Sequence, residues 1–308
     1  MNRIELKSYG KINLTLDVKG LLDNGFHQVE MIMQQIGLCD DISMEWTEGG
    51  EGFRIDLSTN RSFLPTDERN LAYKAALLMN EEFGPRSGEL RIHIMKRIPV
   101  AAGLAGGSGN GGAILHGLNV LWGLNLDVKR LCELGAKFGS DVPFCVMGQA
   151  AANKNLRDRF AGDPLACHCA LATGTGTELK PLVGLKSYLV LSKPSISVST
   201  KEVYKGIDNM DIDVHPNTEK MIDALRNNSL EQIEKNLVNI LENYTLKEYP
   251  TVVYTKNKIK EVGKTEAVLM SGSGPTVFGI CSSREEAQRI CEELRMINEE
   301  SFWTETTY

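Results

Sequence analysis

Strong net charge, long apolar runs and paired cysteines are all missing from this sequence of 308 residues. The net charge is only −6, from 34 basic and 40 acidic residues, so there is no basic surplus for binding nucleic acid or an anionic membrane. No apolar run reaches the roughly 18 residues that a membrane span needs, and the first residues lack the apolar core of a signal peptide. We therefore expect a cytoplasmic protein that binds neither nucleic acid nor a membrane.

The seven cysteines are odd in number and scattered along the chain, which fits free thiols in a reducing compartment. Cys167-His168-Cys169 is the one close group, and the sequence offers no second ligand pair for it, so we do not expect zinc there. Hydrophobic residues make up 42% and charged residues 24%, as in an ordinary globular protein. At about 100–200 residues per domain, this length predicts two domains.

Hydrophobic periodicity predicts strands and helices that interleave in both halves of the chain, which is typical of an α/β or α+β protein. The predicted strands are 4–17, 29–45, 89–94, 188–191, 267–270 and 276–280. The predicted helices are 70–83, 113–122, 124–138, 199–207, 214–226, 230–243, 256–262 and 284–297.

The most informative segment is the glycine-rich stretch from Ile98 to Gly112, which leads into an apolar helical pattern. Glycines let backbone N–H groups converge, and a helix N-terminus adds partial positive charge, so the segment predicts a phosphate site. No Gly-Lys-Ser/Thr follows, so the segment is not a Walker A loop. The alternative is a glycine turn that only permits tight helix packing.

Four other segments carry polar groups in patterns that suit a site. Lys11 and Asn13 share one face of a predicted strand, although a strand lysine is usually just solvated. Asp141 lies in a turn bounded by glycine and proline, where a carboxylate is more often a cap than a catalyst. The remaining two are the turn Asp23-Asn24-Gly25-Phe26-His27 and the small-residue turn 271–274, which can be a plain hairpin.

Together these segments resemble the GHMP kinase superfamily and, within it, the 4-diphosphocytidyl-2-C-methyl-D-erythritol kinases of isoprenoid biosynthesis. The resemblance covers most of the chain. The matching segments are 11–14, 24–27, 67–70, the loop from 98, 139–144, 193–204 and 270–279.

The resemblance implies an α+β fold of two domains, which we expect at 1–175 and 176–308. The first would be a ribosomal protein S5 domain 2-like, ATP-binding domain with a left-handed βαβ unit, and the second would be ferredoxin-like. It also implies ATP-dependent phosphorylation, with Mg²⁺, of the 2-hydroxyl of a small cytidine-diphosphate substrate, by a monomer or homodimer.

Residue roles follow from the same resemblance. Asp141 would be the general base, and Lys11 would pair with it and help neutralise the transferring phosphoryl group. The expected ATP-binding residues are Asn70, Lys96, Pro99, Ala101, Gly103, Leu104, Ala105, Gly106, Gly107, Ser108 and Gly109. Among these, Lys96 and Asn70 are assigned to the adenosine end, and Ser108 is also the candidate for Mg²⁺. The expected substrate-binding residues are Asn13, Phe26, His27, Tyr204, Ser271 and Gly272, with Phe26 and Tyr204 stacking on the cytosine.

The chain departs from the family pattern in two places. Ser108-Gly109-Asn110-Gly111-Gly112 stands where the family usually has Ser-Ser-Asp-Ala-Ala, which predicts a looser phosphate site. Segment 151–169 is an apparent insertion after a predicted strand at Asp141; we expect a tolerated surface loop, and the alternative is a lid or partner contact. Two other functions stay open: a GHMP kinase for another alcohol, such as homoserine or a mevalonate, and a catalytically weak, nucleotide-binding regulatory paralogue.

Overall fold

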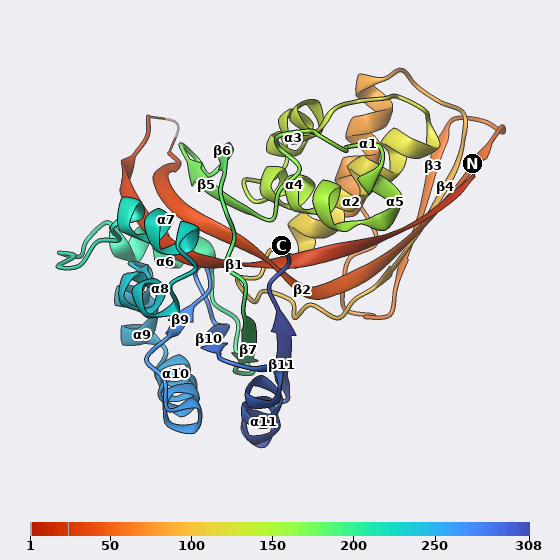
Figure 1. Cartoon of the computed structure of the whole chain (residues 1–308). Coiled ribbons are helices and arrows are strands. Elements are labelled where there is room, and N and C mark those ends of the chain that lie inside the picture. Colours follow the sequence, from red (N-terminus) through yellow and green to blue (C-terminus); the bar gives the residue numbers. More distant parts are fainter. Residues whose placement is uncertain (1, 24) are drawn as a thin grey trace. The chain divides into compact units, whose positions relative to one another are not determined.

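The computed structural model describes residues 2–23 and 25–308 (Figure 1). Its contacts divide the chain into two compact units. Unit 1 comprises the N-terminal residues up to Gly10 with Leu38–Ile98 and Ala105–Cys167, and unit 2 comprises Lys11–Gly37, Pro99–Leu104 and His168–Tyr308. The chain thus passes between the units several times, because the long strands β1 (Arg3–Leu21) and β2 (His27–Glu48) contribute residues to both.

In unit 1, the second half of β2 pairs antiparallel with β4 (Gly88–Met95), and β4 pairs in parallel with β3 (Phe53–Thr59). Leu90, Ile92 and Ile94 of β4 are buried, while the residues between them are exposed. This alternation means that one face of the sheet is covered and the other meets solvent.

Five helices belong to unit 1, and Figure 1 shows them gathered together beside β3 and β4. They are α1 (Leu71–Glu82), α2 (Gly106–Leu121), α3 (Val128–Ala136), α4 (Val142–Ala152) and α5 (Lys154–Arg157). The predicted strand at Asp141 is wrong, because Asp141 is followed directly by α4.

Helix α2 begins at Gly106, seven residues before the predicted start at 113. Its glycines are contact positions on a regular helix. A Cβ on Gly111 would lie 2.8 Å from the Phe138 ring, and one on Gly109 would lie 2.6 Å from Ser8 Oγ. The local preference of glycine against helix is therefore outweighed by close packing that only glycine permits.

Segment 151–169 is anchored in unit 1 through residue 167, so the expectation of a plain surface loop is wrong for its first half. Leu156 and Phe160 are buried, and the Phe160 ring meets the ring of His116 edge-on. The Asn153 side chain accepts from the Lys7 N–H at 2.7 Å and donates to the Lys7 carbonyl at 2.9 Å. These contacts tie the segment to β1.

Unit 2 contains a four-stranded sheet in the order β11-β7-β10-β9, with all neighbours antiparallel. Its strands are β7 (Tyr188–Lys193), β9 (Val268–Met270), β10 (Val277–Cys281) and β11 (Glu300–Glu305), and helices α10 (Pro250–Gly263) and α11 (Arg284–Arg295) pack on it. Numbered along the chain, the order is 4-1-3-2, so the ferredoxin-like expectation is confirmed.

The other strands of unit 2 pair with the long strands. β8 (Val238–Asn239) pairs with β1 in parallel, β5 (Cys169–Thr173) pairs with β2, and β6 (Glu178–Pro181) pairs with β5. The remaining helices are α6 (Thr200–Ile207), α7 (Thr218–Arg226), α8 (Leu230–Asn236) and α9 (Glu242–Glu248). The predicted helix 230–243 is therefore wrong: β8 interrupts it, where Asn239 Nδ2 donates to two carbonyls of the 270–272 turn.

Candidate functional site

The first turn of α2 lies in unit 1 and carries several residues of the predicted phosphate site. Ala105, its N-cap residue, has φ +55°, and among the described residues its side chain caps no N–H of the helix. Gly107 is exposed, and Gly106 and Ser108 are half-buried. Phosphate oxygens can therefore reach N–H groups that carry the partial positive charge of a helix N-terminus.

Lys96 lies beside this turn. Its Nζ is 2.5 Å from Asp40 Oδ2, and a Cβ on Gly106 would stand 2.6 Å from the same Nζ. Burial lowers the pKa of Lys96, and the Asp40 carboxylate opposes that effect. The structure thus places this predicted residue next to the first residue of α2, where it is buried and paired with the Asp40 carboxylate.

Asn70 is the N-cap of α1. Its Oδ1 accepts from the Ala72 N–H at 3.0 Å, and its Nδ2 donates to the Pro65 carbonyl at 2.9 Å. Both ends of the amide therefore have structural partners, and any contact with a nucleotide would be additional.

Asp141 occupies the N-cap position of α4, but within the described part of the chain its side chain makes no capping hydrogen bond. The alternative that this residue serves as a helix cap therefore lacks support. A Cβ on Gly139 would lie 4.0 Å from Ser108 Oγ, which brings the Ser108 hydroxyl close to the turn that carries Asp141.

Lys11 and Asn13 lie on the same face of β1 in unit 2, as the sequence predicts. Lys11 is buried, its Nζ donates to Asn13 Oδ1 at 2.6 Å, and its backbone N–H donates to the Leu104 carbonyl at 3.1 Å. A Cβ on Gly272 would lie 3.4 Å from the Lys11 ammonium. A buried ammonium thus faces the second glycine turn.

The Pro99–Leu104 segment meets the second glycine turn within unit 2. Ser271 Oγ donates to the Gly103 carbonyl at 2.9 Å. Gly103 has φ +72°, and a Cβ there would stand 2.1 Å from the Ser271 carbonyl oxygen. Nearby in the loop, Pro99 is buried and Ala101 is exposed with φ +51°. Unit 2 therefore brings together Lys11, Gly103 and Ser271, which lie far apart in sequence.

The predicted base-binding residues also gather in unit 2. The His27 and Tyr204 rings have centroids 5.0 Å apart, and His27 Nε2 lies 2.8 Å from Asp208 Oδ1. Phe26 is 59% exposed. Asn24, part of the predicted turn, lies outside the described residues.

Comparison with known proteins identifies the family of this chain. Models of the GHMP kinase N-terminal and C-terminal domains match residues 70–149 and 221–297. Proteins named 4-diphosphocytidyl-2-C-methyl-D-erythritol kinase are 44% identical in Alkaliphilus metalliredigens (96% of this chain, 94% of the relative) and 44% identical in Bacillus subtilis (95% and 93%). The chain belongs to this GHMP kinase family.

Solved structures of GHMP kinases have the same fold. A crystal structure of 4-(cytidine 5'-diphospho)-2C-methyl-D-erythritol kinase gives a TM-score of 0.79 at 28% identity, covering 99% of this chain and 100% of that one. A homoserine kinase from Cytophaga hutchinsonii gives 0.70 at 18% identity, covering 100% and 95%, which shows the fold alone. The expected domain ranges 1–175 and 176–308 stay a prediction.

The Mg²⁺ that GHMP kinases would use with ATP has one candidate protein ligand here, the Ser108 hydroxyl. Mg²⁺ takes few protein ligands when phosphate oxygens and water supply the rest, so one hydroxyl beside the predicted phosphate site fits that chemistry. Within the described residues, no group of three or more His, Cys, Asp or Glu side chains is arranged to hold a metal.

Two groups of polar residues, one in each unit, were not predicted from the sequence. Asp208 lies one helical turn after Tyr204, and that spacing was the signal available for it. Ser8 and Asp40 are fully buried and hydrogen-bond to Asn110. A carboxylate inside an apolar strand pattern was the signal for Asp40.

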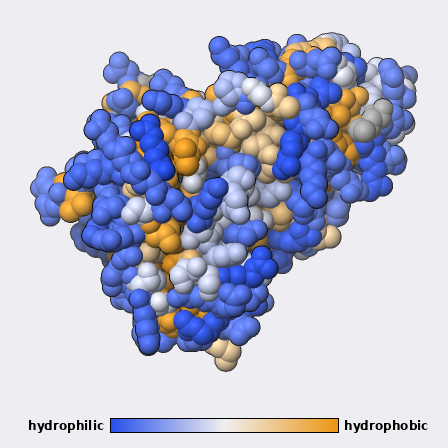
Figure 2. Space-filling model, viewed as in Figure 1, coloured by the Kyte–Doolittle hydropathy of each residue, from blue (hydrophilic) through white to orange (hydrophobic). Residues whose placement is uncertain are grey.

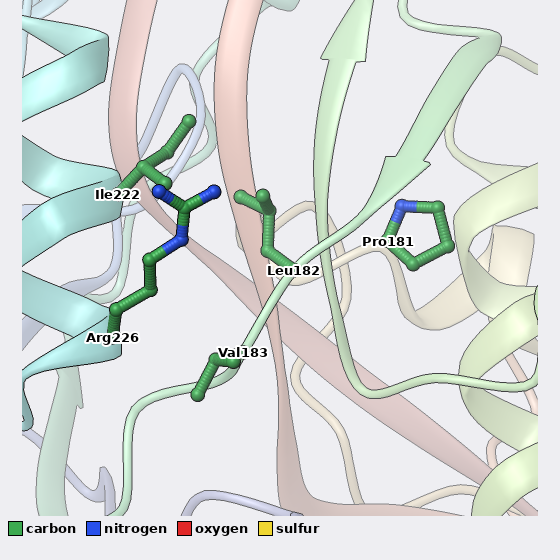
Figure 3. A pocket seen from close by; sticks show the side chains of 5 residues that line it. All are labelled: Pro181, Leu182, Val183, Ile222 and Arg226. Carbon is green, nitrogen blue, oxygen red and sulfur yellow. The ribbon is translucent and has the colours of Figure 1, made fainter.

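A separate pocket of about 350 Å³ lies on unit 2 of this GHMP kinase (Figure 3). Pro181, Leu182 and Val183 line one side, and Ile222 and Arg226 of α7 line the other. The lining includes none of the residues predicted as functional.

The described helices include none with both the length and the apolar character to cross a membrane. The face shown in Figure 2 is covered mainly by hydrophilic residues, with smaller hydrophobic patches between them.

Proposed function

We propose that this chain transfers the γ-phosphoryl group of ATP to the 2-hydroxyl of 4-diphosphocytidyl-2-C-methyl-D-erythritol. The observation that carries the proposal is its identity, over nearly the full length, to relatives that bear this enzyme's name. Kinase membership implies the use of ATP, and the uncapped first turn of α2 suits its phosphates.

The chemistry needs a base, a cation and fixed geometry. Asp141 takes the proton of the substrate hydroxyl, whose oxygen then attacks the γ-phosphorus as the bond to ADP breaks. Lys11 supplies positive charge to the transferring group, and backbone N–H groups of Gly106 to Ser108 hold the phosphates. Mg²⁺, held in part by Ser108, would neutralise charge between the phosphates. The proposal is supported by the exposed N–H groups and by the absence of a capping role for Asp141 among the described residues.

The cytidine end of the substrate is assigned to Phe26, His27 and Tyr204. The His27–Tyr204 ring contact and the exposed Phe26 ring support a site in which a flat base stacks between aromatic groups. Asn13, Ser271 and Gly272 lie close to the Lys11 ammonium or to the turn beside it, and we assign them to the remainder of the substrate.

This aromatic grouping also favours a cytidine substrate over homoserine or a mevalonate, because a substrate without a base needs no stacking pair. We further propose that the enzyme acts in the cytoplasm as a monomer or homodimer.

The first experiment measures ADP release from Mg-ATP with 4-diphosphocytidyl-2-C-methyl-D-erythritol, with homoserine and mevalonate in parallel. We expect turnover of the cytidine compound alone. ATP binding without turnover of any of the three would support the regulatory paralogue instead.

A pair of matched variants tests the base. Asp141→Asn should abolish turnover and leave the Kd of ATP nearly unchanged, because it removes the proton acceptor and keeps the shape. Asp127→Asn is the control: Asp127 holds the same N-cap position on α3, and asparagine caps equally well, so activity should persist. Turnover by Asp141→Asn at the wild-type rate would refute the assignment.

A further inference from the structure

A buried polar cluster in unit 1 joins β1, β2, the residues 96–98 and the first turns of α2. At its centre is Asp40 of β2, which is fully buried. Asp40 Oδ1 accepts from the backbone N–H groups of Arg97 at 2.7 Å and Ile98 at 2.8 Å. Asp40 Oδ2 accepts from Lys96 Nζ at 2.5 Å. One carboxylate therefore binds three consecutive residues, 96–98, directly after β4.

Asn110 of α2 completes the cluster from the other side. Its Nδ2 donates to Asp40 Oδ2 at 2.8 Å and to Ser8 Oγ at 3.0 Å. Next to the cluster, α4 also contacts α2, since Gln149 Nε2 donates to the Gly109 carbonyl at 2.8 Å. The amide of Asn110 thus connects α2 to both β1 and β2.

A buried carboxylate is costly unless charged and polar partners satisfy it. Asp40 has four donors: two backbone N–H groups, an ammonium and an amide. Hydrogen bonds that satisfy a buried carboxylate in a region of low dielectric constrain the positions of the groups that donate them. The cluster therefore has one well-defined geometry.

The position of the cluster along the chain connects it to nucleotide binding. Residues 96–98 lie at the start of the glycine-rich stretch 98–112, and Asn110 lies near its end, one turn beyond the N-terminus of α2. Asp40 therefore holds both flanks of the loop. Fixing a loop in its binding conformation before the ligand arrives lowers the entropic cost of binding.

We propose that Asp40 and Asn110 are positioning residues for ATP. They pre-organise the backbone N–H groups of the glycine-rich stretch, at residues 106–108, without touching the nucleotide. This inference rests on the proposed function, in which that loop binds ATP. Ser8 belongs to the same cluster, because its buried hydroxyl accepts a hydrogen bond from Asn110 and occupies the space next to Gly109.

The test compares Asn110→Ala with Asn119→Ala. Both asparagines are buried in α2, and each makes two side-chain hydrogen bonds, those of Asn119 being with the backbone of Leu126 at the other end of the helix. Thermal unfolding measures the structural cost of each change. Isothermal titration calorimetry measures the Kd of Mg-ATP, and steady-state kinetics give the KM of the cytidine substrate.

We expect Asn110→Ala to raise the Kd of ATP about tenfold, as loss of its hydrogen bonds predicts, with the KM of the cytidine substrate within about twofold of wild type. Asn119→Ala should lower the unfolding temperature comparably and leave the Kd of ATP within about twofold. A Kd of ATP that is unchanged in Asn110→Ala, or raised equally in both variants, overturns the proposal.

If Asn110→Ala does not fold, Ser8→Ala removes only one acceptor, and we expect it to raise the Kd of ATP about threefold; no change overturns the proposal. A wild-type protein that binds ATP but phosphorylates no cytidine compound would refute the proposed function, while the Kd comparison would still decide on the cluster. A wild-type protein that does not bind ATP overturns both.

Discussion

Replacing Gly103 with alanine should break the contact between the phosphate loop and the second glycine turn. Gly103 has φ +72°, where a side chain costs about 1–2 kcal/mol. The added Cβ would also stand 2.1 Å from the Ser271 carbonyl oxygen, which cannot move without disturbing the hydrogen bond from Ser271 Oγ to Gly103. Overpacking of this kind costs about 1–3 kcal/mol, so we expect a loss of about 2–5 kcal/mol in total.

The assay combines urea unfolding with steady-state kinetics. Gly123→Ala is the matched control, because Gly123 has φ +63° but nothing within 4 Å of its Cβ position in the described structure. That variant should lose only the backbone cost of about 1–2 kcal/mol and keep wild-type kinetics. Gly103→Ala should lose more stability and also show a higher KM for ATP and a lower kcat.

The reasoning would be refuted by a Gly103→Ala variant with the same stability and kinetic constants as Gly123→Ala. Such a result would mean that the loop and the turn separate without cost, and that their contact plays no part in activity.

Three further predictions follow from buried or paired polar groups. Burial lowers the pKa of His116 to about 4. Between pH 6.5 and pH 4, His116 therefore binds a proton in the unfolded chain but not in the folded chain. In urea unfolding, the free energy of unfolding of the wild type should therefore fall by about 3 kcal/mol relative to that of His116→Gln between pH 7 and pH 4. A difference between the two proteins that does not depend on pH would contradict this. Thr276 Oγ1 is buried and finds no hydrogen-bond partner within the described residues, so Thr276→Val should raise stability by about 1 kcal/mol in thermal unfolding; a lower unfolding temperature would show that the hydroxyl is satisfied. Asp208→Ala removes the partner of His27 and should raise the KM of the cytidine substrate about three- to tenfold with the KM of ATP unchanged, and equal changes in both would argue against a role at the base.

Much of the candidate site was predictable because its signals are local. Strand periodicity placed Lys11 and Asn13 on one face of β1, and the structure joins them by a hydrogen bond. Helical spacing and the N-cap preference of asparagine placed α1 after Asn70. The two glycine turns were recognised from composition and from the resemblance to GHMP kinases.

The predictions of helices and strands were wrong where tertiary packing outweighed the local preference of the residues. Because glycine disfavours helix, the helix was predicted to begin at 113. In the structure α2 starts at Gly106, since Phe138 and Ser8 occupy the space that side chains on its glycines would need. β11 was missed because its partner is β7, which lies more than a hundred residues earlier in the chain.

The sequence by itself determined the fold family through its resemblance to GHMP kinases. It also determined the order of the motifs and the residue types that the chemistry requires, because these depend on local pattern. Only the tertiary structure decided that Asp40 meets Asn110 across 70 residues and that His27 meets Asp208 across 181. Such pairs depend on which surfaces the folded chain brings together. That outcome is set by the packing of distant segments, and no local periodicity encodes it.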